Sequence, residues 1–146
     1  MVMTDIFFSA PTWIANFPSG AFMQTNDMPP DTSNNTEWPD ELDALVAAPE
    51  HHKLLMENDS VRVIDTLIPP GQTTNLHTHK WPASLYIISW SNFIRYDHEG
   101  NIIVDSRKFT QAPLPSSALW SEPLKPHRLK NVGENDIHIV GVELKS

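Results

Sequence analysis

The chain has 146 residues, enough for one domain with a sizeable core, and a formal net charge of −8 with neutral histidines. Phosphate backbones repel an acidic chain, so the composition argues against nucleic acid as a partner. The sequence contains no cysteine, which excludes disulfides, thiolate-bound zinc, iron–sulfur clusters and cysteine nucleophiles. A metal site in this protein would therefore use histidine, aspartate, glutamate or main-chain oxygen.

Residues 1–36 are rich in Pro, Asn, Ser and Thr and carry scattered aromatic residues without a clear period. Such a segment is either a flexible terminus or an extended arm that lays its aromatic side chains on another surface. The first Lys or Arg is Lys53, so the positively charged start of a secretory signal is absent, and no apolar run is long enough to span a bilayer. We therefore expect a cytoplasmic protein that does not enter a membrane.

Residues 37–49 predict a short helix ahead of the main domain. Pro39 suits a first-turn position, and the acidic residues after it favour the positive end of the helix dipole. The spacing predicts an apolar face formed by Leu42, Leu45 and Val46.

Residues 50–146 predict an all-β domain. The run at 61–68 is dense in β-branched residues, and breaks that contain Pro or Gly follow it at short intervals. Many short strands at close spacing are typical of an antiparallel barrel or sandwich. Further strands are expected at 84–90, 93–96, 102–109, 118–120, 127–132 and 136–145, with a break at 122–126.

Two of the seven histidines, His77 and His79, are one residue apart on a predicted strand. Side chains at i and i+2 of a strand point to the same face, so these two imidazoles would project side by side and could hold one metal ion. A bare H-x-H pair is weak evidence, since nearby histidines are often structural. The pair therefore needs further ligands to indicate a metal site.

The other five histidines have ordinary explanations when each is taken alone. His51 and His52 lie between the helix and the first strand, where we expect them to be exposed. His98 belongs to a polar turn, and His138 alternates with isoleucines on what would be the solvated face of a strand. His127 would pass as a surface residue.

The context of the histidine pair resembles the cupin superfamily. Gly71 stands six residues before His77, giving G-x5-H-x-H, and His127 with Asn131 gives H-x3-N. These patterns are similar to the two cupin signature motifs, and the resemblance covers residues 53–144. It implies a small single-domain cupin with an antiparallel barrel, also called a double-stranded β-helix or jelly roll. Its metal ligands would be His77, His79 and His127.

The chain departs from the cupin pattern where the first motif has its glutamate. That position falls at Ala83 or Ser84, and neither residue can be a carboxylate ligand. The cupin glutamate points inward, so the resemblance implies that Ala83, Leu85 and Ile87 also face the barrel interior. Three acids could still supply the carboxylate from elsewhere: Glu122, Asp97 and Glu99.

The missing carboxylate leaves two readings. The site is either a three-histidine centre, similar to the Fe(II) sites of thiol dioxygenases and a diketone-cleaving dioxygenase, or a lapsed site in a persisting barrel. Retention of all three histidines favours the metal, because a buried histidine needs a partner. Imidazole also suits Zn, Ni, Mn and Cu.

The resemblance thus implies a metal-dependent enzyme acting on a small-molecule substrate, with an Fe(II)-dependent dioxygenase as the leading hypothesis. The alternatives are a non-catalytic metal- or ligand-binding cupin and a metal-assisted isomerase or lyase. Small cupins commonly dimerise, so a homodimer is expected. Arg95 and Arg107 could bind a substrate anion, although arginines more often lie at the surface.

Overall fold

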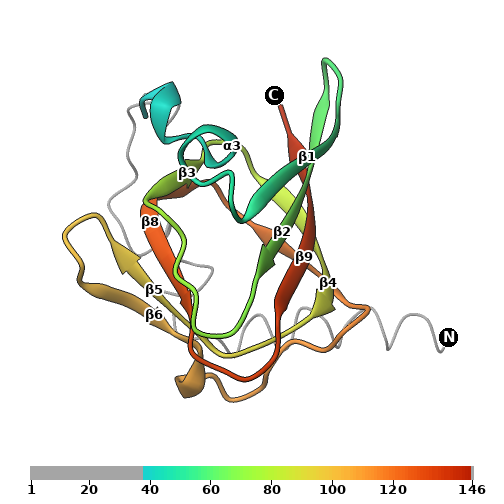
Figure 1. The fold of residues 1–146 in the computed structure, drawn as a ribbon. Coiled ribbons are helices and arrows are strands. Elements are labelled where there is room, and N and C mark those ends of the chain that lie inside the picture. Colours follow the sequence, from blue (N-terminus) through green and yellow to red (C-terminus); the bar gives the residue numbers. More distant parts are fainter. Residues whose placement is uncertain (1–37, 146) are drawn as a thin grey trace, which may run out of the picture.

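The structure is a computed structural model that describes residues 38–145. Two antiparallel sheets face each other in it (Figure 1). The arm predicted for 1–36 lies outside the described residues. One sheet has the order β1-β2-β9-β4-β7 and the other β3-β8-β5-β6. The strands are β1 His52–Glu57, β2 Val61–Ile68, β3 His77–His79, β4 Ala83–Ser89, β5 Phe93–Asp97, β6 Ile102–Asp105, β7 Ala118–Ser121, β8 Leu124–Asn131 and β9 Ile137–Leu144. The predicted all-β barrel is confirmed.

Alternation along the strands fills the barrel interior. β2 spans the β-branched run predicted for it, and β4 directs Ala83, Leu85 and Ile87 inward as expected, while Tyr86 between them is exposed. The apolar core gathers where β2 ends and where β5 and β9 begin. Its buried members are Ile68, Ile87, Phe93, Val104, Leu119 and Ile137.

The segment before the barrel is not one helix, which corrects the prediction for 37–49. It forms a 3-10 turn, η2 (Asp40–Leu42), and one α-helical turn, α3 (Ala44–Ala47). Between them Asp43 is extended, and its carboxylate accepts a hydrogen bond from Leu45 N at 3.0 Å, so it caps a new helix start. The predicted apolar face is also wrong, since Val46 is 62% exposed and the small residue Ala44 is buried instead.

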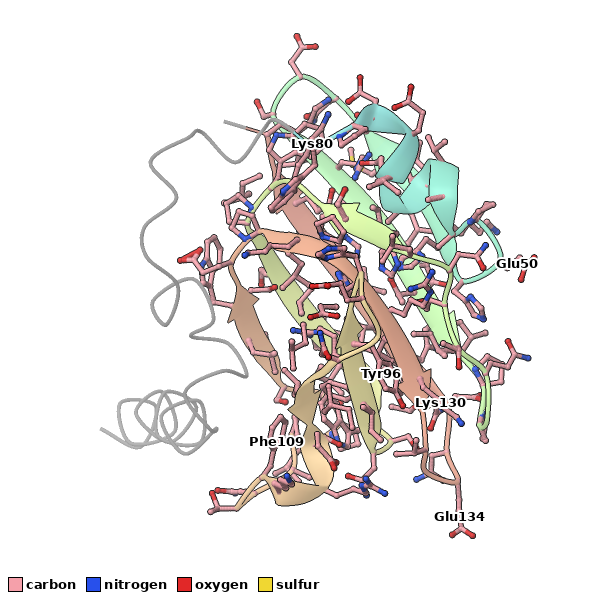
Figure 2. The ribbon with its side chains drawn as sticks, turned by 90° about the vertical axis from the view of Figure 1, so that its left-hand side faces the viewer. Glu50, Lys80, Tyr96, Phe109, Lys130 and Glu134 are labelled. Atoms are coloured by element: carbon pink, nitrogen blue, oxygen red, sulfur yellow. The ribbon has the colours of Figure 1, made fainter. Side chains whose placement is uncertain are left out.

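These two helical turns lie over one end of the barrel. Thr78, between the two β3 histidines, donates from its hydroxyl to Leu42 O at 3.3 Å. Figure 2 shows Lys80 at this end of the molecule and Phe109 and Glu134 at the opposite end. Across residues 38–145 no helix is both long and apolar enough to cross a membrane.

The glycine and asparagine of the cupin-like patterns have structural roles. Gly71 has φ +81°, which favours glycine, and its N–H donates to Asn131 O at 2.9 Å. The buried Asn131 side chain donates to Ile68 O and Asn135 O, and it accepts from the Ser91 hydroxyl. Asn131 therefore fixes the turns between strands and is not a metal ligand.

β8 begins earlier than predicted. The break expected at 122–126 instead contains the first residues of β8, from Leu124. Proline is tolerated there because the register between β3 and β8 shifts, pairing His77 with His127 but His79 with Leu124.

Candidate metal centre

The paired histidines of β3 lie side by side, as the strand period predicts. His77 and His79 face the same cavity, and their ring centroids are 5.1 Å apart. Thr78 between them points toward the helical turns instead. This short strand therefore supplies two imidazoles to one point in the barrel.

His127 reaches the same place from β8. It is the pairing partner of His77 across the two strands, and the ring centroids are 4.3 Å apart. Its distance to the His79 ring is 5.9 Å. The structure thus brings the three histidines implied by the cupin resemblance together, while metal coordination by them stays a prediction.

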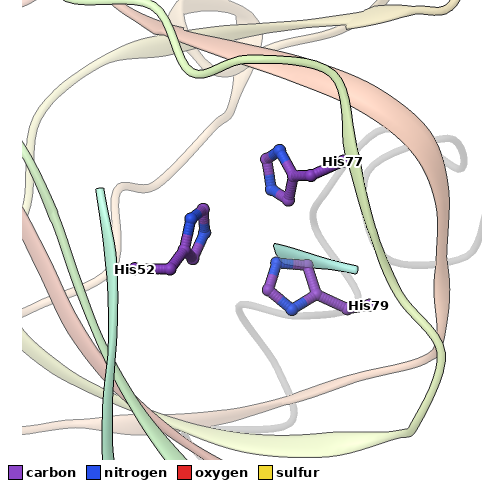
Figure 3. Close-up of side chains that lie close together, drawn as sticks. All are labelled: His52, His77 and His79. Atoms are coloured by element: carbon purple, nitrogen blue, oxygen red, sulfur yellow. The ribbon is translucent and has the colours of Figure 1, made fainter. Parts of the chain in front are cut away.

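A fourth histidine joins this group, which corrects the expectation that His51 and His52 are exposed. Both are buried. The His52 ring, at the start of β1, is 4.5 Å from the His77 ring and 5.3 Å from the His79 ring. One ring nitrogen from each of His52, His77 and His79 lies within 4.8 Å of the others, so these three could hold a metal ion (Figure 3). His51 points elsewhere and contacts the Gln72 side chain.

The Nδ1 atoms of all four histidines have acceptors. His52 Nδ1 is 2.9 Å from Ala48 O, His77 Nδ1 is 2.8 Å from Asn75 O, and His127 Nδ1 is 2.7 Å from Lys125 O. His79 Nδ1 is 2.9 Å from a carboxylate oxygen of Glu143. A carbonyl oxygen only accepts, so Nδ1 must carry the proton, and a neutral ring then keeps its lone pair on Nε2. Metal-binding histidines are typically oriented in this way.

The electrostatics keep three of these rings neutral. Burial, assisted by the nearby His79, lowers the pKa of His52 to about 3. Burial also holds the pKa of His77 well below its ordinary value, with His127 as the next cause. For His127, burial and then the positive charge of Arg95 lower the pKa. These rings need lose no proton before they bind a metal ion at neutral pH.

The carboxylate beside His79 belongs to a buried ionic network. Glu143 is 2% exposed, and its other oxygen accepts from Arg62 Nε at 2.8 Å. Arg62 also makes a two-pronged contact with Asp43, at 3.1 and 2.9 Å. Burial alone would raise the pKa of the Asp43 carboxyl, but the hydrogen bonds and charge of Arg62 outweigh burial and lower it. The network thus links the cap of α3 to the ring of His79.

Glu143 also accounts for the empty glutamate position of the first motif. Ala83 faces the cavity there, and it pairs with Glu143 across β4 and β9. The acid that the sequence lacks on β4 is therefore present on the next strand, on the far side of His79. The acids considered beforehand lie elsewhere: Asp97 and Glu99 form an exposed turn, and Glu122 accepts from the Trp120 indole.

The histidines line a partly open cavity of about 100 Å³. Most of its other walls are aliphatic, which limits the number of water molecules it can order. Arg95, for which the sequence leaves open an anion-binding role or the commoner surface position, is buried in this wall. The remaining wall residues include Ile64, Ile68, Leu85, Leu124, Leu129 and Ile139.

The donor set fits a divalent transition metal. It offers imidazoles whose Nδ1 atoms are held by acceptors, most of the other cavity walls are of low polarity, and one of the rings is backed by a carboxylate. His52, His77 and His127 would not have to lose a proton or give up the hydrogen bond of Nδ1 to bind the ion.

Comparison with solved structures identifies the fold. A cupin domain from Bordetella pertussis Tohama I matches with a TM-score of 0.52 and 17% identity, over 65% of this chain and 92% of that chain. A double-stranded β-helix protein of Klebsiella pneumoniae gives a TM-score of 0.44 and 17% identity, over 64% of this chain and 70% of that chain. A polyketide cyclase from Streptomyces resistomycificus gives a TM-score of 0.42 and 15% identity, over 64% of this chain and 63% of that chain. The domain has the cupin fold.

Sequence comparison adds no relative to these structures. No protein-family model matches the chain, and no curated protein matches it.

Proposed function

We propose that His52, His77, His79 and His127 hold one divalent metal ion and that the protein is an Fe(II)-dependent dioxygenase of a small molecule. The observation that carries this proposal is the shared orientation of the four rings. Each Nδ1 has an acceptor in the surrounding protein, and all four rings line one cavity, so that Nε2 is the nitrogen each ring can offer to a metal ion.

The absence of a carboxylate among the proposed ligands favours oxygenase chemistry. When held by the four imidazoles, Fe(II) would supply an electrophilic centre for an anionic substrate and O2. Glu143 lies behind His79, where it fixes the orientation of the ring, and part of the negative charge of Glu143 is offset by Arg62. The protein would therefore hold the ion without a directly bound anion of its own.

The cavity walls define what the rest of the site does. Aliphatic side chains such as Leu85, Leu129 and Ile139 exclude water from the space beside the rings. Excluding water strengthens electrostatic interactions with a bound anion and protects a reactive intermediate from hydrolysis. The small cavity volume favours a substrate of few heavy atoms.

Metal content tests the site itself. Substitution His77→Ala should remove most of the metal that co-purifies or is reconstituted, measured by elemental analysis. His98→Ala is the matched control, because His98 lies in an exposed turn away from the cavity. Equal metal content in wild type and His77→Ala would contradict the assignment.

Oxygen uptake tests the reaction. Protein reconstituted with Fe(II) under anaerobic conditions should consume O2 when mixed with its substrate, and both oxygen atoms should appear in the product when ¹⁸O2 is used. Panels of thiols, diketones and catechols provide the first substrates. Full metal occupancy without O2 uptake across these panels would favour a non-catalytic binding protein or a metal-assisted isomerase or lyase.

A further inference from the structure

A buried arginine in the cavity wall has no counter-ion among residues 38–145. Arg95 stands on β5 and is 7% exposed. Its Nε and Nη1 atoms are buried and have no hydrogen-bond partner within residues 38–145. A guanidinium is a group of five fixed donors, and burying it without acceptors is strongly unfavourable. The folded protein therefore carries an unsatisfied donor set beside the histidine cluster.

Arg95 remains charged in this position. Burial lowers its pKa to about 10, which is still far above neutral pH, and burial is the only cause of the lowering. The Phe93 ring, 5.7 Å from the guanidinium carbon, provides a weak cation–π contact. That contact supplies no hydrogen-bond acceptor, so the positive charge is left largely uncompensated.

The other buried arginine at this site shows the contrast. Arg62 has two carboxylates, Asp43 and Glu143, which occupy its donors in a closed network. Arg95 has no comparable partner in the described part of the chain. Protein acids thus satisfy one buried guanidinium and leave the second available.

The strand register places Arg95 close to the proposed metal site. It pairs with Leu129 across β5 and β8, and His127 lies two residues from Leu129 on the same face of β8. Arg95 and His127 therefore enter the cavity from the same sheet. Glu143 enters from the opposite sheet, on β9. The cavity has an unpaired cation on one side and a paired carboxylate on the other.

We infer that Arg95 anchors the carboxylate of a small aliphatic organic acid whose other end lies against the histidine cluster. The planar fork of a guanidinium matches a carboxylate in a bidentate pair. The cavity volume of about 100 Å³ and its aliphatic walls restrict the acid to a short chain. That the bound acid is a substrate rests on the proposed function. The anion site itself does not require the metal.

Calorimetric titration tests the anchor in both metal-free and Zn(II)-reconstituted protein. The probes are butyrate, 2-oxobutyrate and, as an uncharged isostere, butyramide. Wild type should bind the two carboxylates in both forms and should not bind butyramide. Arg95→Gln should weaken carboxylate binding by at least about tenfold, because a charge-assisted hydrogen-bonded pair is lost.

Two further variants control this experiment. Arg107→Gln removes an arginine that is half exposed and paired with Asp105, so it should bind carboxylates as wild type does. Arg95→Lys keeps the charge without the fork and should bind more weakly than wild type but more tightly than Arg95→Gln. Thermal unfolding should show that Arg95→Gln is at least as stable as wild type, since an uncompensated buried charge is removed.

The outcomes separate the anchor from the metal proposal. Equal carboxylate affinity in wild type and Arg95→Gln, no carboxylate binding by wild type, or equal binding of butyrate and butyramide would each overturn the anchor. Arg95-dependent binding in metal-free protein would uphold it even if the histidines bound no metal. The metal content of Arg95→Gln is measured beside the titrations. If it equals that of wild type, the loss of carboxylate binding comes from Arg95 and not from loss of metal.

Discussion

Glu143 lies directly across from Ala83 in the pairing of β9 with β4, and its carboxylate is 2.9 Å from Nδ1 of His79. The strand next to β4 thus supplies the acid that the first cupin-like motif lacks. Its position changes its role, because it contacts the far side of a ring whose Nε2 remains available to a metal ion. In the proposed metal site the carboxylate would therefore orient a ligand instead of neutralising the metal.

Replacing Glu143 by Gln should weaken metal binding without abolishing it. His79 would lose its charged acceptor, and outer-shell substitutions of this kind typically cost about 10–100-fold in metal affinity. Disrupting the buried pair with Arg62 should also destabilise the fold by about 3 kcal/mol. Competition with a metal-sensitive chelator and urea unfolding measure the two effects. Glu99→Gln, in an exposed turn, should change neither, and wild-type affinity in Glu143→Gln would contradict the orienting role.

The adjacent histidines His51 and His52 form a matched pair for testing the fourth ligand. His52→Ala should lower the affinity for divalent metal by at least about tenfold. Substitution of an outer-shell partner alone typically costs about 10–100-fold, and loss of a coordinating imidazole should cost no less. His51→Ala should leave affinity unchanged, since that ring contacts Gln72 outside the cluster. Titration with Co(II) also reports the ligand set through its visible spectrum. A spectrum of His52→Ala identical to that of wild type would remove His52 from the site.

The metal-free protein should lose stability as the pH falls below about 6.5. That value is the ordinary pKa of histidine and applies to the unfolded chain. Burial holds the folded-state pKa of His52 at about 3, and it holds those of His77 and His127 well below 6.5. The unfolded state therefore binds more protons in this window, and stability falls with pH by up to about 1.4 kcal/mol per unit for each histidine.

Urea unfolding of chelator-treated protein between pH 7.5 and about 4.5 checks this dependence. His52→Asn removes one of the three buried titrating groups and should give a shallower slope. A profile that is flat below pH 6.5 would show that the three rings are protonated in the folded state.

Homodimer formation, expected from the cupin resemblance, stays a prediction, and the outer face of the five-stranded sheet is where we place it. Tyr86, Ile88 and Trp120 are exposed on β4 and β7. Light scattering with size exclusion at micromolar concentration should show a dimer that Trp120→Lys disrupts. Ile102→Lys changes an exposed apolar residue of the other sheet and should have no effect. A monomer in the wild type would count against the prediction.

The features that sequence could predict depend on local periodicity. The β-branched run at 61–68 coincides with β2. Because His77 and His79 are two residues apart on a strand, both rings lie on the same face. The same alternation places Ala83 and Leu85 on one face, and the cupin resemblance implies that this face points inward. None of these predictions needs knowledge of which strands are neighbours.

The features that sequence missed depend on pairing between distant segments. Nothing near His52 reveals that β1 will place its first residue against β3. Glu143 did carry a signal, because it continues the alternation of Ile139 and Gly141, which line the cavity. The same holds for Arg95, which follows the buried Phe93 by two residues. Without the register, an acid or a cation on an inward face cannot be assigned a partner.

The position of His52 on β1 also affects how tightly the cluster is held over time. Among the strands of residues 38–145, β1 is an edge strand that pairs only with β2, with an irregularity after Leu54, and every residue of β1 after His52 is exposed. Edge strands with few buried contacts open at a lower free energy than the rest of a domain. Amide hydrogens of β1 should therefore exchange faster than those of β2 and β9. Each opening would withdraw one imidazole and leave the other three in place, so a metal ion bound at the proposed site would exchange without unfolding of the barrel.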